Sequence, residues 1–501
     1  MRTAWFARSL AALGLALLAA MPCHANDGSD PGATALASTT LKPPPLPADA
    51  HIAQRMRLDG HWLDYRVTVG SLPVRDDKGN KVADVVYTAY TVAGAHARPV
   101  TFALNGGPGA ASVYLNFGAI GPKHIPFGNQ GDGPTALPRL EDNPATWLDF
   151  TDLVFIDPVG TGFSRSLVDD KESTKLFFST DADFRYLSRC IYDWLLRNGR
   201  MESPKYLVGE SFGGYRGPRI ADYLQTRLGV ALRGMVLISP FLDPAAYRDR
   251  GVSPLPWMLT LPAITAAHLE RVGRLTPHAM QAVIDYTRGA YAHALMLGNS
   301  DPAARDAMIA KVTELTGLDP AFVQRSGGRL DAQAYLREAY RAQQRVGSIN
   351  DSNVSAWDPF PWSPRQPGDD PVVNGSLAPL TAAMLQFVTR TVGWKIDAPY
   401  EAMNDHVMQL WHRDGDADEG AMRDLRAVVA DDPGLQVLIA HGWNDLTCPL
   451  MASLLIVDQM PTMEGRHRVR VRAYPGGHMF YTRPASDAAL RRDAMKLYGA
   501  H

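Results

Sequence analysis

Residues 205–214 read KYLVGESFGG, and this stretch decides the fold. An apolar run ends in Gly209-Glu210-Ser211-Phe212-Gly213, and a helix-like segment follows. This is the G-x-S-x-G pattern, in which the chain leaves a strand, turns sharply at the serine and enters a helix. Glycines are expected beside the turn because larger side chains would collide with the neighbouring strand and helix. The pattern is short, so the rest of the chain has to decide whether Ser211 is a nucleophile.

Apolar strands and helical segments alternate on both sides of this stretch. A helix from Thr180, with Asp183 in a capping position, carries an apolar stripe, and a last helix covers 486–498. Expected buried strands are 98–104 (RPVTFAL), 150–157 (FTDLVFID), 235–239 (MVLIS) and 435–440 (LQVLIA), with 468–472 (RVRVR) nearer the sheet edge. The alternation predicts an α/β fold with a mostly parallel central sheet.

Two further features complete the predicted architecture. Residues 62–72 and 82–92, joined by a turn at 76–80, predict antiparallel strands at the N-terminal side of the sheet. Residues 245–385 exceed the length of one further strand–helix unit and predict a helical cap insertion. We therefore expect a catalytic domain made of residues 51–244 and 386–501.

The N-terminus has the pattern of a targeting segment. Arg2 and Arg8 precede an apolar run at 10–20 that is too short for a permanent membrane anchor, and small residues lead to Ala25. We predict a signal peptide over 1–25, cleaved near Ala25, and a disordered, proline-rich tether over 26–50. The protein would then be exported, either to the periplasm or out of the cell.

Charge and cysteine content limit the possible partners and crosslinks. Cleavage would leave 48 Lys and Arg against 52 Asp and Glu, a mild charge that argues against nucleic acid or an anionic membrane as the main partner. Only Cys190 and Cys448 would remain, enough for one disulfide at most. Cys190 lies on an apolar helix face, so we expect it to be buried rather than bonded.

A base and an orienting carboxylate are expected after Ser211 in the chain order Ser, Asp, His. Asp445 follows the strand at 435–440, and His478 follows the strand at 468–472, so both stand at strand ends. Taken singly, Asp445 could cap the next helix and His478 could be a surface histidine. His441 is a rival base, but it precedes its own turn. The joint pattern predicts Ser211, Asp445 and His478 as a catalytic triad.

Acyl transfer also needs two backbone N–H donors for the developing oxyanion. Phe212, directly after the serine, supplies one candidate. The sequence Asn105-Gly106-Gly107-Pro108-Gly109 follows an early strand, and Gly107 is the second candidate. The alternative for this loop is a plain tight turn.

Several motifs together resemble the serine carboxypeptidases, α/β hydrolases that remove single residues from peptide C-termini, usually at acidic pH. The motifs are NGGPG at 105–109, DPVGTGFS at 157–164, GESFGG at 209–214, the Asp445 turn and Gly477-His478-Met479. The resemblance assigns the same triad and oxyanion donors. It also implies that Asn105 and Glu210 bind the terminal carboxylate of the substrate and that Met479 contributes to substrate binding.

The chain departs from this family's pattern at three positions. Ala103 and Ala110 stand where the family usually has Trp and Cys, and Ala119 stands where it commonly has a second carboxylate partner. Glu210 can donate to a carboxylate only when protonated, and its alternative role is to brace the turn. An esterase or acyltransferase using the same triad is therefore an alternative, and a non-catalytic binding protein is a remote one.

Two further patterns resemble ligand sites and lack the residues that these sites require. Asp414, Asp416 and Asp418 resemble the start of a calcium loop, but Glu419 replaces the required glycine. The glycines of residues 160–162 lack the Lys-Ser/Thr of a phosphate-binding loop. We expect no metal and no organic cofactor.

Overall fold

The computed structural model describes residues 44–94, 98–128, 139–247, 252–363, 370–412, 420–462 and 468–500. The chain divides into two units, Met1–Pro44 and Pro45–His501, and the fold concerns the second. The predicted signal peptide and most of the predicted tether lie outside the described residues. The acidic turn at 414–418 also lies outside them.

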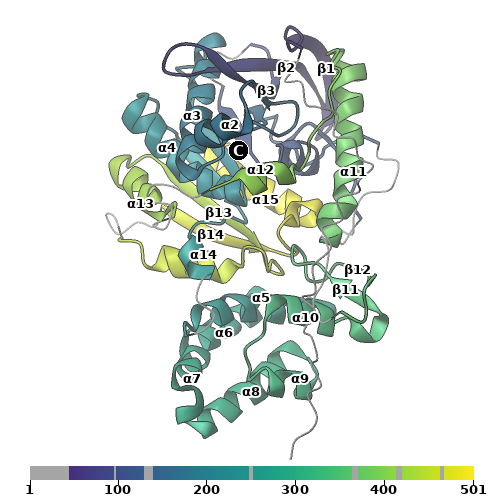
Figure 1. The fold of residues 1–501 in the computed structure, drawn as a ribbon, viewed down its shortest axis with the longest axis vertical. Helices are drawn as coiled ribbons and strands as arrows, with labels where there is room; N and C mark the ends of the chain where they lie inside the picture. The colour runs from purple at the N-terminus through teal and green to yellow at the C-terminus, as the bar shows by residue number, and fades with distance from the viewer. Residues whose placement is uncertain are drawn as a thin grey trace, which may run out of the picture. The chain divides into compact units, whose positions relative to one another are not determined.

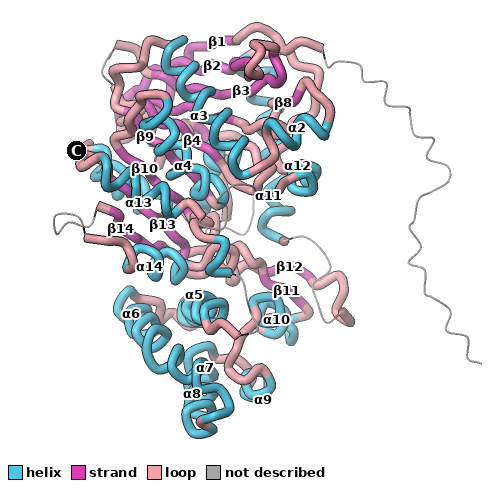
Figure 2. Tube along the Cα trace, turned by 60° about the vertical axis from the view of Figure 1, so that its left-hand side comes forward, coloured by secondary structure: helices cyan, strands magenta, loops and turns pink. Residues whose placement is uncertain are grey.

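One large sheet organises the described part of the chain (Figures 1 and 2). Its strand order is β1-β2-β3-β7-β4-β9-β10-β13-β14, and β8 pairs with β3. The strands are β1 (Ala50–Leu58), β2 (His61–Arg75), β3 (Lys81–Thr91), β4 (Val100–Leu104), β7 (Asp152–Ile156), β8 (Arg165–Ser166), β9 (Lys205–Glu210), β10 (Gly234–Ile238), β13 (Gln436–Gly442) and β14 (Val469–Tyr474).

The sheet is antiparallel at its N-terminal side and parallel elsewhere. β1, β2, β3 and β7 pair antiparallel, whereas β7, β4, β9, β10, β13 and β14 pair parallel. This arrangement confirms the predicted α/β-hydrolase fold. β14 ends the strand order, as its alternating arginines predict. β1 was not predicted: it covers residues assigned to the end of the tether and the start of the domain.

Alternate residues of the central strands enter two different hydrophobic cores, one on each face of the sheet. Phe102 and Leu104 of β4 belong to one core, and Ala103 between them belongs to the other. The first core is covered by α3 (Thr180–Arg197), α4 (Phe212–Arg227) and α13 (Met422–Asp431). The second is covered by α15 (Pro484–Tyr498) and by α11 (Pro371–Gln386) with its continuation η6 (Phe387–Val392).

Segment 255–338 is almost entirely helical and has a hydrophobic cluster of its own. Its elements are α5 (Leu255–Arg271), α6 (Pro277–Tyr286), η3 (Thr287–Tyr291), α7 (Ala292–Leu297), η4 (Gly298–Ser300), α8 (Pro302–Thr316), α9 (Pro320–Arg325) and α10 (Ala332–Glu338). η5 (Arg341–Gln343) follows, and then a small hairpin of β11 (Arg345–Gly347) and β12 (Ser355–Trp357). The division of the chain at 245 and 385 into catalytic domain and cap stays a prediction.

Short elements complete the described chain. They are α1 (Val113–Leu115), η1 (Asn116–Ile120), β5 (Lys123–His124), β6 (Glu141–Asp142), α2 (Asp170–Leu176), η2 (Pro244–Tyr247), α12 (Asp405–Leu410), α14 (Leu450–Asp458) and η8 (Phe480–Thr482). Segment Pro371–Val392 is long and apolar enough to cross a membrane, by length and composition only. Leu380, Met384 and Phe387 of this segment pack in the same core as β1–β3, as in the core helix of a globular domain.

Three local predictions can be compared with the structure. α3 begins at Thr180 as predicted, but its N-cap is Ser179, whose hydroxyl accepts from the Ala182 N–H. The prediction that Asp183 caps this helix is wrong. The Asp183 carboxylate pairs with Arg216 of α4 instead. Cys190 and Cys448 are both buried and free, so they form no disulfide with each other.

Candidate active site

Ser211 stands at a strained turn between β9 and α4. Its backbone has φ 58° and ψ −120°, in a region that residues with a side chain rarely occupy. The strain is held by backbone hydrogen bonds: the Ser211 N–H donates to the Ile238 oxygen (2.9 Å), and the Ser211 oxygen accepts from the Phe241 N–H (3.0 Å). The predicted geometry of the G-x-S-x-G turn is thus present.

Close backbone contacts explain why glycines surround the serine. A Cβ on Gly209 would collide with the Gly213 carbonyl, and one on Gly213 would collide with the Leu104 carbonyl. A Cβ on Gly214 would collide with Pro240. β9, α4 and the loops after β4 and β10 therefore approach too closely for any larger residue.

Asp445 and His478, predicted from two separate strand ends, are hydrogen-bonded to each other. Asp445 Oδ2 lies 2.9 Å from His478 Nδ1. Asp445 Oδ1 accepts from the N–H groups of Thr447 and Cys448, both at 2.8 Å, so the carboxylate is fixed on both oxygens. The N-cap of α14 is Pro449, which excludes the alternative that Asp445 caps this helix. His478 is buried, which excludes a surface histidine.

The electrostatics of this pair favour a basic imidazole. Burial alone lowers the pKa of His478, but the Asp445 carboxylate outweighs burial, so the pKa lies above its ordinary value. With Nδ1 engaged by Asp445, Nε2 is the nitrogen left to exchange a proton. The backbone of His478 is fixed as well, because its N–H donates to the Asn350 oxygen (2.5 Å) and its oxygen accepts from Ser239 Oγ (2.8 Å).

His441, the rival base, has a different environment. It is fully buried within β13, and its Nε2 lies 2.8 Å from Ser453 Oγ. Burial lowers its pKa to about 3, so it stays neutral across the working range of pH. We therefore assign His441 a structural role, in which its bond to Ser453 connects the end of β13 to α14.

Ser211 is connected to the Asp445 loop through Cys448. The Ser211 side chain lowers the pKa of the Cys448 thiol against the larger effect of burial, and the backbone N–H of the same cysteine donates to Asp445. Burial raises the pKa of this thiol well above its ordinary value, so it is a neutral neighbour of the serine. The structure thus brings the elements that carry all three predicted triad residues to one place.

The loop carrying Gly107 contacts the serine turn directly. A Cβ on Gly106 would lie 2.5 Å from the Phe212 nitrogen, so only a glycine allows this approach. Phe212 is the first residue of α4, and its N–H has no carbonyl of a preceding helical turn to bond. Gly107 has φ +97°, which a residue with a side chain would not adopt. The loop thus lies directly against the serine turn, and the oxyanion role of Gly107 and Phe212 stays a prediction.

A buried ion pair fixes this loop, and sequence reasoning missed it. Arg216 Nε lies 2.5 Å from Asp183 Oδ2, with both side chains buried. Arg216 Nη1 also donates to the Asn105 oxygen at 2.7 Å. Two charged residues on the apolar faces of consecutive helices were the available signal, because such residues are rarely buried without a partner.

Glu210 is almost completely enclosed, with 3% of its surface exposed. The Asn105 amide donates to Oε2, and the Tyr481 hydroxyl donates to Oε1 at 2.7 Å. Burial raises the pKa of Glu210 to about 7, although the charge of His478 and both hydrogen bonds lower it. Asn105 and Glu210, predicted to act together, are in contact. Tyr481 was missed, although it stands only three residues after His478.

The remaining named positions are apolar and buried. Met479 packs in the core that also contains Tyr481 and Phe480. Ala103, Ala110 and Ala119 are buried in the same core. Within the described residues, no group of three or more His, Cys, Asp or Glu could hold a metal ion, and the expectation of no metal and no cofactor stays a prediction.

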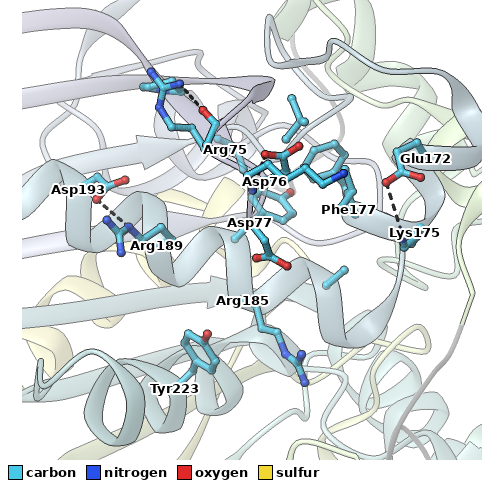
Figure 3. A pocket seen from close by; sticks show the side chains of 18 of the residues that line it. Arg75, Asp76, Asp77, Glu172, Lys175, Phe177, Arg185, Arg189, Asp193 and Tyr223 are labelled. Carbon is cyan, nitrogen blue, oxygen red and sulfur yellow. Dashed lines mark hydrogen bonds and ion pairs between the residues drawn. The ribbon is translucent and has the colours of Figure 1, made fainter.

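A cavity of about 1030 Å³ lies elsewhere, and its walls are charged (Figure 3). It is bordered by the β2–β3 turn, α2 and α3, and by none of the predicted site residues. Ion pairs such as Arg189–Asp193 and Lys175–Glu172 neutralise its charges locally. We assign it no role in the chemistry.

Comparisons with known proteins agree with these motifs. The pheromone-processing carboxypeptidase kex1 of Schizosaccharomyces pombe is 28% identical over 147 residues, which are 29% of this chain and 26% of that protein. Carboxypeptidase S1 of Penicillium janthinellum is 30% identical over 146 residues, 28% of this chain and 30% of that protein. The alignments thus span less than a third of each relative.

A solved structure, the proline iminopeptidase of Mycobacterium smegmatis, covers 86% of this chain and 97% of its own, with 14% identity and a TM-score of 0.36. The broadest match is to a family model described as serine carboxypeptidase, which covers residues 70–475. This range contains most of the sheet and extends from β2 to the end of β14. The chain therefore belongs to the serine carboxypeptidase family.

Proposed function

We propose that the protein is a serine-type carboxypeptidase that releases C-terminal residues from peptides through an acyl-enzyme. The observation that carries the proposal is the bonded pair of Asp445 and His478 on the loops that meet the strained Ser211 turn. Strain of this kind persists only where the surrounding structure enforces it, and it clusters at active sites. Membership of the serine carboxypeptidase family supports the peptide substrate.

The reaction follows from the positions of these groups. His478 takes the proton of the Ser211 hydroxyl through Nε2 while Oγ attacks the last peptide carbonyl. The Gly107 and Phe212 N–H groups receive the oxyanion that forms. The imidazolium then gives its proton to the leaving amine, the C–N bond breaks, and the C-terminal residue departs. Water, activated by the same histidine, attacks the ester and restores free Ser211.

Glu210 and Asn105 give this machinery a preference for a peptide end. Both are adjacent to the reacting loops: Glu210 precedes the serine, and Asn105 precedes the Gly106-Gly107 pair. With a pKa of about 7, Glu210 carries a proton below neutral pH and can then donate to a carboxylate. This supports recognition of a free C-terminus at acidic to neutral pH.

The cellular location belongs to the same proposal. Basic residues, a short apolar run and small residues before Asn26 are the sequence features of a cleavable export signal. We propose that the mature enzyme acts on peptides in the periplasm or outside the cell. Mass determination of the exported protein tests this, and an N-terminus that retains residues 1–25 would contradict it.

A labelling experiment tests the triad. Purified protein should react with a serine-directed fluorophosphonate, and Ser211→Ala should lose the label completely. Ser188→Ala is the matched control, because Ser188 is a buried serine whose hydroxyl donates to the Phe184 oxygen inside α3. Equal labelling of Ser211→Ala and the wild type would refute the serine-hydrolase mechanism.

A substrate series tests the carboxypeptidase specificity. We expect N-blocked dipeptides with a free carboxylate to be cleaved faster than their C-terminal amides. Cleavage of esters and amides with no cleavage of the free acids would leave the triad in place and favour the esterase or acyltransferase alternative.

A further inference from the structure

The proposed carboxylate subsite contains one acid, Glu210, with one phenol bonded to it and a second phenol in its electrostatic neighbourhood. The first phenol, Tyr481, donates to Glu210 Oε1 at 2.7 Å and is itself buried. Its ring borders the backbone of η1: a Cβ on Gly118 would lie 3.1 Å from Tyr481 Cε2. Tyr481 therefore packs against η1 at Gly118, one residue before Ala119, the position that supplies no acid.

The second phenol, Tyr114, has no protein partner. Its hydroxyl is buried, 4% of the residue is exposed, and the oxygen makes no hydrogen bond within the described residues. It lies close enough to Glu210 and Tyr481 to interact with both electrostatically. A buried hydroxyl without a partner is unfavourable, and native proteins seldom keep one unless a ligand or water completes it.

We propose that two phenols complete the carboxylate subsite: Tyr114 donates a hydrogen bond to the terminal carboxylate of the peptide, and Tyr481 positions Glu210. The inference rests on the proposed function, because it requires a substrate with a free C-terminus. Tyr114 acts on the substrate, whereas Tyr481 acts through Glu210.

The contacts explain what Tyr481 does for the acid. Its hydroxyl occupies Oε1, which leaves Oε2, beside the Asn105 amide, to carry the proton. The Glu210 proton, an amide N–H of Asn105 and the Tyr114 hydroxyl are then three donors for one carboxylate. A carboxylate accepts several hydrogen bonds, and those made to a charged group are the stronger ones.

Several titratable groups face Glu210 and set the pH at which it loses this proton. His478 lowers its pKa by charge, Asp445 raises it, and the Tyr481 bond lowers it. Cys448 and Tyr114 are neutral neighbours whose own pKa values are raised by burial and by Glu210. Removing the Tyr481 hydroxyl therefore moves the pKa of Glu210 upward.

The first experiment compares an N-blocked dipeptide with its C-terminal amide on Tyr114→Phe. We expect KM for the free acid to rise about ten-fold or more, the usual effect of losing a hydrogen bond to a charged group. We expect kcat for either substrate and KM for the amide to change less than about two-fold. Tyr65→Phe is the control, because Tyr65 also has a buried hydroxyl without a hydrogen bond, and it lies in β2.

The second experiment follows KM for the free acid against pH on Tyr481→Phe. The rise of KM at high pH should shift to higher pH, because Glu210 keeps its proton longer. Glu210→Gln, whose amide donates at every pH, should make this KM independent of pH. Tyr291→Phe is the control, since it loses an equally buried hydroxyl bond, to the Gly328 oxygen, in the helical segment.

The outcomes separate the two proposals. If the wild-type protein does not prefer the free-acid dipeptide over its C-terminal amide, both the carboxypeptidase specificity and the phenol subsite are refuted. A wild type with this preference, unchanged in Tyr114→Phe, overturns the role of Tyr114 alone. An unshifted pH profile in Tyr481→Phe, with fluorophosphonate labelling intact, overturns the role of Tyr481.

Discussion

The proposed mechanism needs two buried groups of the site, His478 and Glu210, in opposite protonation states. His478 must be neutral to accept the Ser211 proton, and the Asp445 carboxylate holds its pKa above the ordinary value. Glu210 must be protonated to donate to a substrate carboxylate, and burial holds its pKa at about 7. The two requirements therefore oppose each other as the pH changes: a higher pH favours neutral His478 and removes the proton of Glu210.

This opposition predicts different pH profiles for two substrate classes. For a free-carboxylate peptide, kcat/KM should rise as His478 loses its proton and fall as pH increases through about 7, where Glu210 ionises. For an ester of the same peptide, the rise should remain and the fall should disappear, because no carboxylate is bound. An identical fall with both substrates would contradict the assignment to Glu210.

The proposed triad could be predicted from the sequence, whereas the tyrosines of the proposed subsite could not. Ser211, Asp445 and His478 each follow a recognisable strand, and their order along the chain indicates the triad. Tyr114 and Tyr481 belong to segments far apart in the sequence, and the fold brings them into the same core. Nothing in their local sequence distinguishes them from ordinary core tyrosines.

Helices α3 and α4 together fix the loop that carries Gly107. Asp183 of α3 and Arg216 of α4 form a buried pair, and the arginine continues to the carbonyls of Asn105 and Gly106. The guanidinium also lies over the Phe212 ring, 5.1 Å from its centroid. The pair therefore connects α3 and α4 to the 105–106 backbone, which lies against the serine turn, and to Phe212, which follows the serine.

Breaking this pair should affect stability and activity together. We expect Arg216→Met to lower the free energy of unfolding by about 3–5 kcal/mol, because Asp183 would be left buried and unpaired. It should also slow fluorophosphonate labelling, since the Gly107 loop loses its anchor. Urea unfolding and labelling rates measure the two effects.

The matched control for this substitution is a more exposed ion pair on α3, the helix that carries Asp183. Arg185 of α3 pairs with Asp181 one turn earlier, and its side chain is 57% exposed. Arg185→Met should cost less than about 1 kcal/mol and leave labelling unchanged. Equal losses of unfolding free energy in Arg216→Met and Arg185→Met would show that burial does not set the strength of the Arg216–Asp183 pair.

At the level of elements, the sequence predicted the central strands and the edge strand β14, but it did not predict β1 at the opposite edge. β7 and β9 are apolar on both faces, which is the pattern of buried parallel strands. β1 has alternating, largely polar residues and becomes a strand only by pairing with β2, from Ala50 opposite Val69 to Leu58 opposite His61. Its structure therefore depends on a partner that local pattern does not reveal.

At the scale of the whole described chain, a polar network connects the helical segment to the loops that carry Asp445 and His478. Glu270 of α5 accepts from Arg483 Nη1 and from the Asn444 amide, both at 2.6 Å. Arg483 Nη2 also donates to Asp351 Oδ2 at 2.6 Å. Asn444 precedes Asp445, and Arg483 follows the His478 loop, so α5 is tied to both members of the bonded pair.

This network predicts that a change in α5 reaches the chemistry. Glu270→Gln removes the charge that faces Arg483 and one of the acceptors that the network requires, so the Asp445 and His478 loops should lose part of their support. We expect kcat to fall several-fold, KM to change less, and the melting temperature to drop by a few degrees. Glu314→Gln, which removes an exposed pair with Lys311 on α8, should change none of these values. If steady-state kinetics and thermal unfolding of Glu270→Gln match those of Glu314→Gln, α5 does not support the catalytic loops.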